Sequence, residues 1–121
     1  MMTMPNLTQK HCVPCEGGVP MLMPEEVGEY LKQVPGWTRD LTSTKISRTF
    51  RFKDFVEAMK FVNKVAELAE EEGHHPNLLI NYSRVTLTLW THAIGGLSEN
   101  DFILAAKIHA LGKEHTGDQM I

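Results

Sequence analysis

Two adjacent histidines, His74 and His75, lie between an acidic run and Pro76, and a third histidine, His92, follows further along the chain. Of all side chains, histidine has the unperturbed pKa closest to neutrality, so it can both donate and accept protons at physiological pH. Histidines that converge from two parts of a chain could supply a general acid and a general base to one substrate. The pattern therefore predicts a site for proton transfer.

Two other interpretations of these histidines must be weighed. Three histidines can hold a catalytic zinc ion. However, neighbouring residues point to opposite sides of an extended chain and diverge by about 100° on a helix, so His74 and His75 are poorly placed to share one ion. We therefore expect no metal. Both side chains could instead be surface cations near a helix C-terminal dipole, and His109 and His115 are expected to be plain surface residues.

The only two cysteines, Cys12 and Cys15, form a Cys-x-x-Cys motif directly after His11. Two cysteines are too few for a disulfide framework, and a four-ligand zinc site would need a second pair. The simplest interpretation is two reduced cysteines in a polar arm. A metal-binding or redox role, with His11 as a third ligand, stays open.

The composition is that of one globular domain: of 121 residues, 42% are hydrophobic and 22% charged. A net charge of −3 predicts no direct binding of nucleic acid, which requires clustered basic residues. Met1–Lys10 shows no apolar leader and no apolar run could span a membrane, so we expect a cytoplasmic protein. Chain-breaking residues and periodicity predict an irregular arm over 1–20, a domain over 21–116 and a tail over 117–121.

A change of hydrophobic period marks the first elements of the domain. A helix is expected to begin near Pro24, which suits the first helical position, and to end at Pro35-Gly36. Between Trp37 and Phe52 apolar and polar residues alternate instead. This alternation predicts two strands joined by a turn.

The longest predicted helix ends where the histidines begin. Asp54 is a suitable N-cap, with Glu57 three residues later as in a capping box. Gly73 fits the position after the last turn, where a left-handed conformation costs it little, and Pro76 prevents continuation. The apolar stripe of this helix is expected to comprise Phe55, Ala58, Met59, Val62, Val65, Ala66 and Ala69.

Two more strands and a helix complete the domain. Residues 77–82 and 85–92 are expected to pair through a turn, which places His92 at the end of a strand. Ser98 is the expected N-cap of the last helix, and Asp101 occupies its N3 position. The predicted order is α-β-β-α-β-β-α, an α+β fold with three helices packed on one face of a four-stranded antiparallel sheet.

Short segments spread over residues 22–111, without a gap, carry a resemblance to a known family. They are Leu31-Lys32-Gln33-Val34-Pro35-Gly36-Trp37, Arg48-Thr49-Phe50-Arg51-Phe52-Lys53-Asp54-Phe55, Val65-Ala66-Glu67-Leu68-Ala69-Glu70, His74-His75-Pro76, Asn81-Tyr82, Thr91-His92 and Gly96-Leu97-Ser98-Glu99-Asn100-Asp101. With these segments the chain resembles the pterin-4a-carbinolamine dehydratases. The resemblance implies an α+β fold, no metal, no cofactor, and assembly as a homodimer or homotetramer.

Members of this family dehydrate 4a-hydroxytetrahydropterin to quinonoid dihydropterin, which recycles the cofactor of aromatic amino acid hydroxylases. The reaction needs an acid on the leaving oxygen and a base for a ring N–H proton. The resemblance implies His74, His75 and His92 as the catalytic histidines. It also implies two supporting carboxylates, Glu70 and Asp101, and Asp101 is expected to orient His92. The residues expected to contact the pterin are Gly73, Pro76, Trp90, Thr91 and Trp37.

Two departures from the family leave other functions open. Gly73 stands where animal members can carry an acidic residue, and the arm with Cys12 and Cys15 is missing from the shortest members. One alternative is a non-catalytic pterin-binding or dimerisation module, because animal members also act as dimerisation cofactors of a homeodomain transcription factor. The other alternative is a dehydratase-like protein of molybdopterin metabolism.

Overall fold

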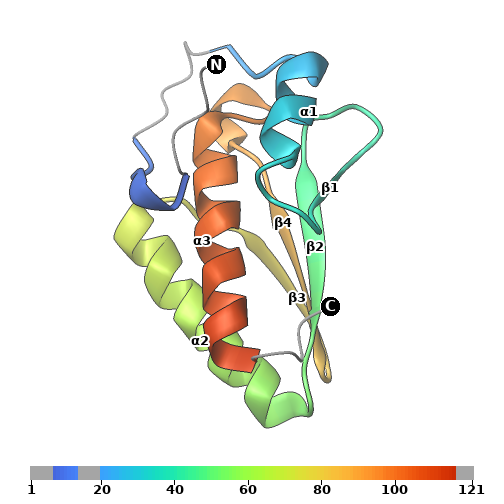
Figure 1. The fold of residues 1–121 in the computed structure, drawn as a ribbon, viewed down its shortest axis with the longest axis vertical. Helices are drawn as coiled ribbons and strands as arrows, with labels where there is room; N and C mark the ends of the chain where they lie inside the picture. The colour runs from blue at the N-terminus through green and yellow to red at the C-terminus, as the bar shows by residue number, and fades with distance from the viewer. Residues whose placement is uncertain (1–6, 14–19, 117–121) are drawn as a thin grey trace.

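The computed structural model describes residues 7–13 and 20–116, with side chains described as far as residue 112. Three α-helices and a four-stranded sheet follow one another in the predicted order, which confirms the α+β fold (Figure 1). The helices and strands are α1 (Pro24–Leu31), β1 (Thr38–Arg39), β2 (Ile46–Arg51), α2 (Phe55–Glu72), β3 (Asn77–Asn81), β4 (Arg84–Leu89) and α3 (Glu99–Thr116). Of two 3-10 turns, η1 (Leu7–Gln9) precedes α1 and η2 (His92–Ile94) lies between β4 and α3.

The sheet is antiparallel throughout, with strand order β1-β2-β4-β3. Helices α2 and α3 lie side by side against one face of it (Figure 1). Alternation along β2 and β4 directs apolar side chains toward these helices, and Ile46 and Phe50 pair across the strands with Leu89 and Val85. All four are completely buried, and burial of each such side chain stabilises the fold by roughly 1.5–3 kcal/mol.

The boundaries of α2 follow from its capping residues, as the sequence predicts. The Asp54 carboxylate accepts a hydrogen bond from the backbone N–H of Glu57 at 2.9 Å. At the other end Gly73 is left-handed, with φ of 68°. The predicted apolar stripe is wrong at two positions, because Phe55 and Ala66 are exposed.

The buried face of α2 is instead rotated by a small angle around the helix axis. Phe61, absent from the predicted stripe, is completely buried and packs against the rings of Phe50 and Phe52 at centroid distances of 4.8 and 5.0 Å. Periodicity alone does not choose between adjacent residues at the border of a helix face. Contact with Phe50 of β2 and with Phe52, directly after that strand, decides which border is buried.

The start of α3 also forms as predicted. The backbone N–H of Ser98 donates to Asp101 Oδ2 at 3.0 Å, which is one half of a capping box. Behind this first turn Leu104, Ala105 and Ile108 are completely buried. The capping bond begins the helix, and it also fixes the carboxylate of Asp101 at the N-terminal end of α3.

Residues 7–13 pack against the domain, although nothing in the sequence pattern predicts that the arm docks. Leu7 is 2% exposed and belongs to the hydrophobic core. Lys10 Nζ donates to Glu99 Oε2 at 2.8 Å, at the first residue of α3. A single apolar anchor and polar contacts hold the segment, and neither leaves a periodic signature. Cys15 lies outside the described residues.

His109 is not the plain surface residue that the sequence predicts, because it is half-buried beside Arg48. Arg48 Nη1 donates to His109 Nδ1 at 2.8 Å and to the carbonyl oxygen of Pro35 at 3.0 Å. An arginine side chain only donates, so this contact requires an unprotonated Nδ1 on His109. The side chain of His115 lies outside the described residues. No helix in the described part of the chain is long and apolar enough to cross a membrane.

Candidate active site

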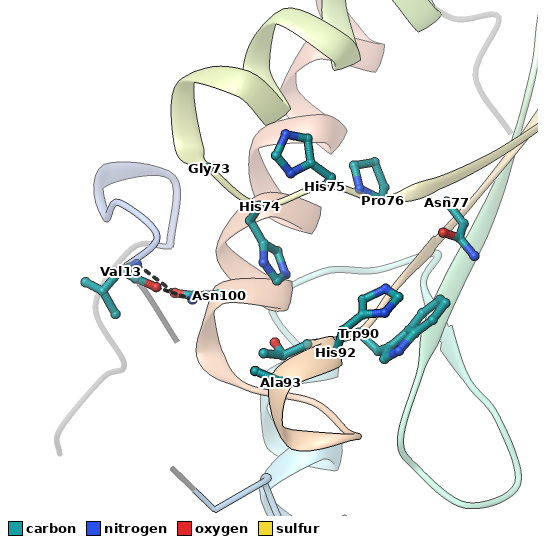
Figure 2. A pocket seen from close by; sticks show the side chains of 11 residues that line it. Val13, Gly73, His74, His75, Pro76, Asn77, Trp90, His92, Ala93 and Asn100 are labelled. Atoms are coloured by element: carbon teal, nitrogen blue, oxygen red, sulfur yellow. Dashed lines mark hydrogen bonds between the residues drawn. The ribbon is translucent and has the colours of Figure 1, made fainter. Parts of the chain in front are cut away.

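A cavity of about 470 Å³ opens between the end of α2, the end of β4 and the start of α3. Figure 2 shows the side chains around it, including the three histidines singled out above. This volume is in the usual range for sites that bind small molecules. The residues that line it are Val13, Gly73, His74, His75, Pro76, Asn77, Trp90, Thr91, His92, Ala93 and Asn100.

His74 bonds a completely buried carboxylate behind the cavity wall. Its Nε2 lies 2.6 Å from Asp101 Oδ1, and the two side chains are 12% and 0% exposed. Asp101 Oδ2 also accepts from the Thr91 hydroxyl at 2.9 Å and from the Ser98 backbone N–H. Because an ionised carboxylate only accepts, Nε2 of His74 carries a proton, and in the neutral imidazole Nδ1 is then the acceptor.

His75 is bonded to a carboxylate as well, but at the surface. Its Nε2 lies 2.5 Å from Glu70 Oε2, and the side chains are 60% and 78% exposed. The turn at Gly73 sends the two histidines to different partners, as expected for adjacent residues. Figure 2 shows their rings pointing to opposite sides of the chain.

His92 reaches the cavity from the opposite side. It begins η2, and the loop that carries it is closed by a hydrogen bond of 2.9 Å from the Thr91 backbone N–H to the carbonyl oxygen of Gly96. The imidazole stacks on the Trp90 ring, with centroids 4.3 Å apart and planes at 28°. Lys45 Nζ lies 4.5 Å from the Trp90 ring as well, a cation–π distance.

The structure brings together most of the residues that the sequence singles out. The three histidines line the cavity, as do Gly73, Pro76, Trp90 and Thr91. Glu70 and Asp101 each bond a histidine from behind. Asp101 differs from expectation in its partner, since it contacts His74 instead of His92.

Trp37 lies elsewhere. Its side chain is 4% exposed and packs edge-on against Phe50, with ring centroids 6.3 Å apart, so it belongs to the core. Conversely, sequence reasoning missed four residues of the cavity wall: Val13, Asn77, Ala93 and Asn100. The sequence could have indicated Asn100, because it directly precedes Asp101, which was predicted to support the site. Nothing in the sequence indicated Val13.

The described residues provide no cluster of three or more His, Cys, Asp or Glu side chains that could hold a metal ion. Burial, together with the negative charge of Glu72, raises the pKa of Cys12 to about 12. The thiol therefore stays protonated at neutral pH, whereas thiol redox chemistry uses the thiolate. This disfavours a redox role for Cys12.

The fold and the site define an α+β protein with a histidine-lined cavity suited to proton transfer on a small ligand. Residues 20–111 match the family described as Pterin 4 alpha carbinolamine dehydratase. The chain belongs to this family.

Individual relatives agree with this membership. A protein of Halorhodospira halophila, named provisionally as a pterin-4-alpha-carbinolamine dehydratase, is 49% identical over 88% of this chain and 98% of its own length. A protein of Methylococcus capsulatus with the same provisional name is 49% identical over 90% of this chain and 96% of its own length. A crystal structure of a transcriptional coactivator/pterin dehydratase from Brucella melitensis covers 76% of this chain and 98% of that one, with 37% identity and a TM-score of 0.73.

Proposed function

We propose that this protein is a pterin-4a-carbinolamine dehydratase, a hydro-lyase that releases water from 4a-hydroxytetrahydropterin to form quinonoid dihydropterin. The family and the names of the relatives support this activity. The observation that carries the proposal is the placement of histidines on two sides of one cavity, with His74 supported by the buried carboxylate of Asp101. The proposed physiological role is recycling of tetrahydrobiopterin, in the cytoplasm and without a cofactor.

In the proposed reaction the bond between C4a and its oxygen breaks, and the bonding electron pair leaves with the oxygen. An acid protonates this oxygen to give water, while a base removes a ring N–H proton, whose bonding pair forms the new carbon–nitrogen double bond. One histidine is then protonated and the other deprotonated, and exchange with solvent restores both. Substrate and product differ only by water, so no redox partner is needed.

We assign the base to His74 and the acid to His92. The hydrogen bond from His74 Nε2 to Asp101 leaves Nδ1 as the proton acceptor, and the carboxylate stabilises the imidazolium that forms. His92 approaches from the other side of the cavity, with its ring held by Trp90. His75 also lines the cavity, but its supporting carboxylate is in water, where its influence is screened.

Turnover of 4a-hydroxytetrahydrobiopterin by the purified chain tests the activity, with and without a chelator. We expect catalysis in both conditions, and loss of activity on chelation that zinc restores would contradict acid–base catalysis by histidine alone. Pterin binding without turnover would favour the binding module. Preference for a molybdopterin precursor would favour a dehydratase-like protein of molybdopterin metabolism.

A double-mutant cycle on His74 and His92 tests the assignment of roles. Each single change to alanine should lower kcat by roughly 100- to 10,000-fold. The double variant should lose much less than the product of the two losses, because residues that act as a unit are not additive. Fully additive losses would show that the two histidines do not act in one proton transfer.

We also propose that the chain assembles as a homodimer or homotetramer. Strand β3 is at the edge of the sheet, and all five of its residues are exposed, with Leu78, Leu79 and Ile80 at 39%, 65% and 37%. An open apolar edge of this kind favours pairing with another strand. Light scattering on the Leu79→Lys variant should show dissociation, and an unchanged mass would place the interface elsewhere.

A further inference from the structure

A short stretch of the N-terminal segment, His11–Val13, is hydrogen-bonded to the ends of two helices beside the cavity. The backbone N–H of Cys12 donates to Glu72 Oε1 at 2.8 Å. Val13 pairs with Asn100 twice, since its N–H donates to Oδ1 at 3.0 Å and its carbonyl accepts from Nδ2 at 2.7 Å. Figure 2 shows this double contact at the edge of the cavity. We call this stretch the strap.

The two contacts of the strap lie next to the residues that hold His74. Glu72 is the last residue of α2, and only Gly73 separates it from His74. Asn100 directly precedes Asp101 in the first turn of α3. The strap, at the edge of the cavity, therefore joins the same two helix ends that the bond between His74 and Asp101 joins.

The anchor on α2 is a buried and satisfied carboxylate. The Glu72 side chain is 2% exposed and bonds Lys107 Nζ at 2.6 Å, and His11 Nδ1 lies 3.3 Å away. Burial alone would raise the pKa of Glu72, but the hydrogen bonds from Lys107 and the Cys12 N–H lower it to about 2. The anchor is thus charged at neutral pH and has limited freedom to move.

The anchor on α3 is a buried amide. Asn100 is 5% exposed, and both ends of its amide are used by the Val13 backbone. A further contact joins Cys12 Sγ to the Asn100 carbonyl oxygen at 3.5 Å. Because the Asn100 side chain is buried, loss of these bonds would leave its amide without partners, which is unfavourable. Asn100 therefore holds the strap in one geometry.

We propose that the strap and Asn100 position His74 for proton transfer by fixing the distance between the ends of α2 and α3. Asn100 is a positioning residue, acting through the contact between His74 and Asp101. Misplacement of a catalytic group by about 1 Å can cost on the order of 100-fold in rate. The kinetic part of this inference rests on the proposed dehydratase function, whereas the geometric part does not.

The test compares Asn100→Ala with Lys10→Ala in the full-length protein. Lys10→Ala is the matched control, because it removes another contact of the same segment with α3, the ion pair to Glu99. The ¹⁵N chemical shifts of the His74 ring report its tautomer without any substrate. We expect Asn100→Ala to mix the two tautomers of His74 and to lower kcat about tenfold with KM within about twofold, a partial loss of positioning. Lys10→Ala should leave both readouts unchanged.

Unchanged His74 shifts and an unchanged kcat in Asn100→Ala would overturn the inference, whatever the melting temperature. Equal losses of kcat in the two variants would overturn it too, since general anchoring of the segment would then explain them. If Asn100→Ala does not fold, the same measurements are made on Asn100→Ser, which keeps one hydrogen-bonding group at this position. If the wild-type chain does not turn over the carbinolamine, the proposed function fails, and the His74 tautomer still decides whether the strap positions the ring.

Discussion

Two adjacent histidines, each bonded to a carboxylate through Nε2, experience opposite environments in this protein. The His74 and Asp101 side chains are 12% and 0% exposed, whereas those of His75 and Glu70 are 60% and 78% exposed. An exposed ion pair contributes about 0.2–1 kcal/mol and is screened by salt, while a buried pair acts at a lower effective dielectric constant. The buried carboxylate of Asp101 therefore orients His74, whereas Glu70 makes only a surface contact with His75.

The difference originates in the neighbours of the carboxylate. Asp101 accepts from Thr91 and from the Ser98 backbone as well as bonding His74, so it is immobile and its buried charge is satisfied. Glu70 bonds His75 from a side chain that is 78% exposed, so water surrounds the rest of its carboxylate. Burial with several donors, more than proximity to a histidine, makes a carboxylate useful for catalysis.

The comparison predicts its largest effect for the histidines themselves: replacing His74 should reduce kcat far more than replacing His75. His74→Ala should lower kcat by about 1,000-fold and His75→Ala by about tenfold or less, within and below the usual range for acid–base groups. Circular dichroism should stay native for both, since neither ring belongs to the core. Equal losses in steady-state turnover would break the comparison, because the buried carboxylate would then confer no advantage.

A second buried carboxylate, Glu72, extends the comparison to stability. Its pKa is lowered from 4.5 to about 2, so its contribution is present above pH 4.5 and is lost as the pH falls toward 2. Glu72→Gln should reduce the free energy of unfolding at pH 7 by about 3 kcal/mol, and the gap to wild type should close between pH 4.5 and pH 2. Urea unfolding as a function of pH measures this.

The matched control for Glu72 is Glu29→Gln, which breaks an exposed ion pair with Lys32. Its effect on the free energy of unfolding should stay below about 1 kcal/mol at every pH. Similar pH profiles for the two variants would show that burial does not strengthen the Glu72 contacts.

Asp101→Asn isolates the charge of the buried pair. An asparagine amide that faces His74 donates, so Nε2 must become the acceptor and the proton moves to Nδ1, where the base is needed. We expect a loss of kcat of about 100-fold, as for a histidine held in the wrong tautomer. The weakened cap should cost about 1 kcal/mol in thermal unfolding. A normal rate together with this stability loss would assign Asp101 to helix capping alone.

Glu70→Gln should have the smallest effect. Because Glu70 and His75 are both exposed, water replaces the lost contact and kcat should stay within about threefold of wild type. Steady-state kinetics at low and high salt checks this. A loss as large as that of Asp101→Asn would show that substrate binding buries the Glu70 side chain.

Local chemistry in the sequence determined the elements and the place of the histidines at the exit of a helix. Asp54 and Gly73 bound α2, and Ser98 with Asp101 begins α3, because capping depends on residues only three or four positions apart. Alternation determined which face of β2 and β4 is buried, since side chains alternate by simple geometry along a strand. These features could be predicted before any packing was known.

Only the tertiary structure decided which carboxylate supports which histidine. Asp101 is 27 residues from His74 in the chain, and Val13 is 87 residues from Asn100, so no local periodicity connects them. The docking of the N-terminal segment depends on one buried leucine and on hydrogen bonds from the segment's backbone to the side chains of Glu72 and Asn100. The segment contributes only backbone groups to these bonds, so its own residue types do not record them. Trp37 could have faced the cavity or the core, and packing against Phe50 placed it in the core. Contacts between distant segments are selected by burial and mutual fit across the whole fold, and residue types and spacing do not record that selection.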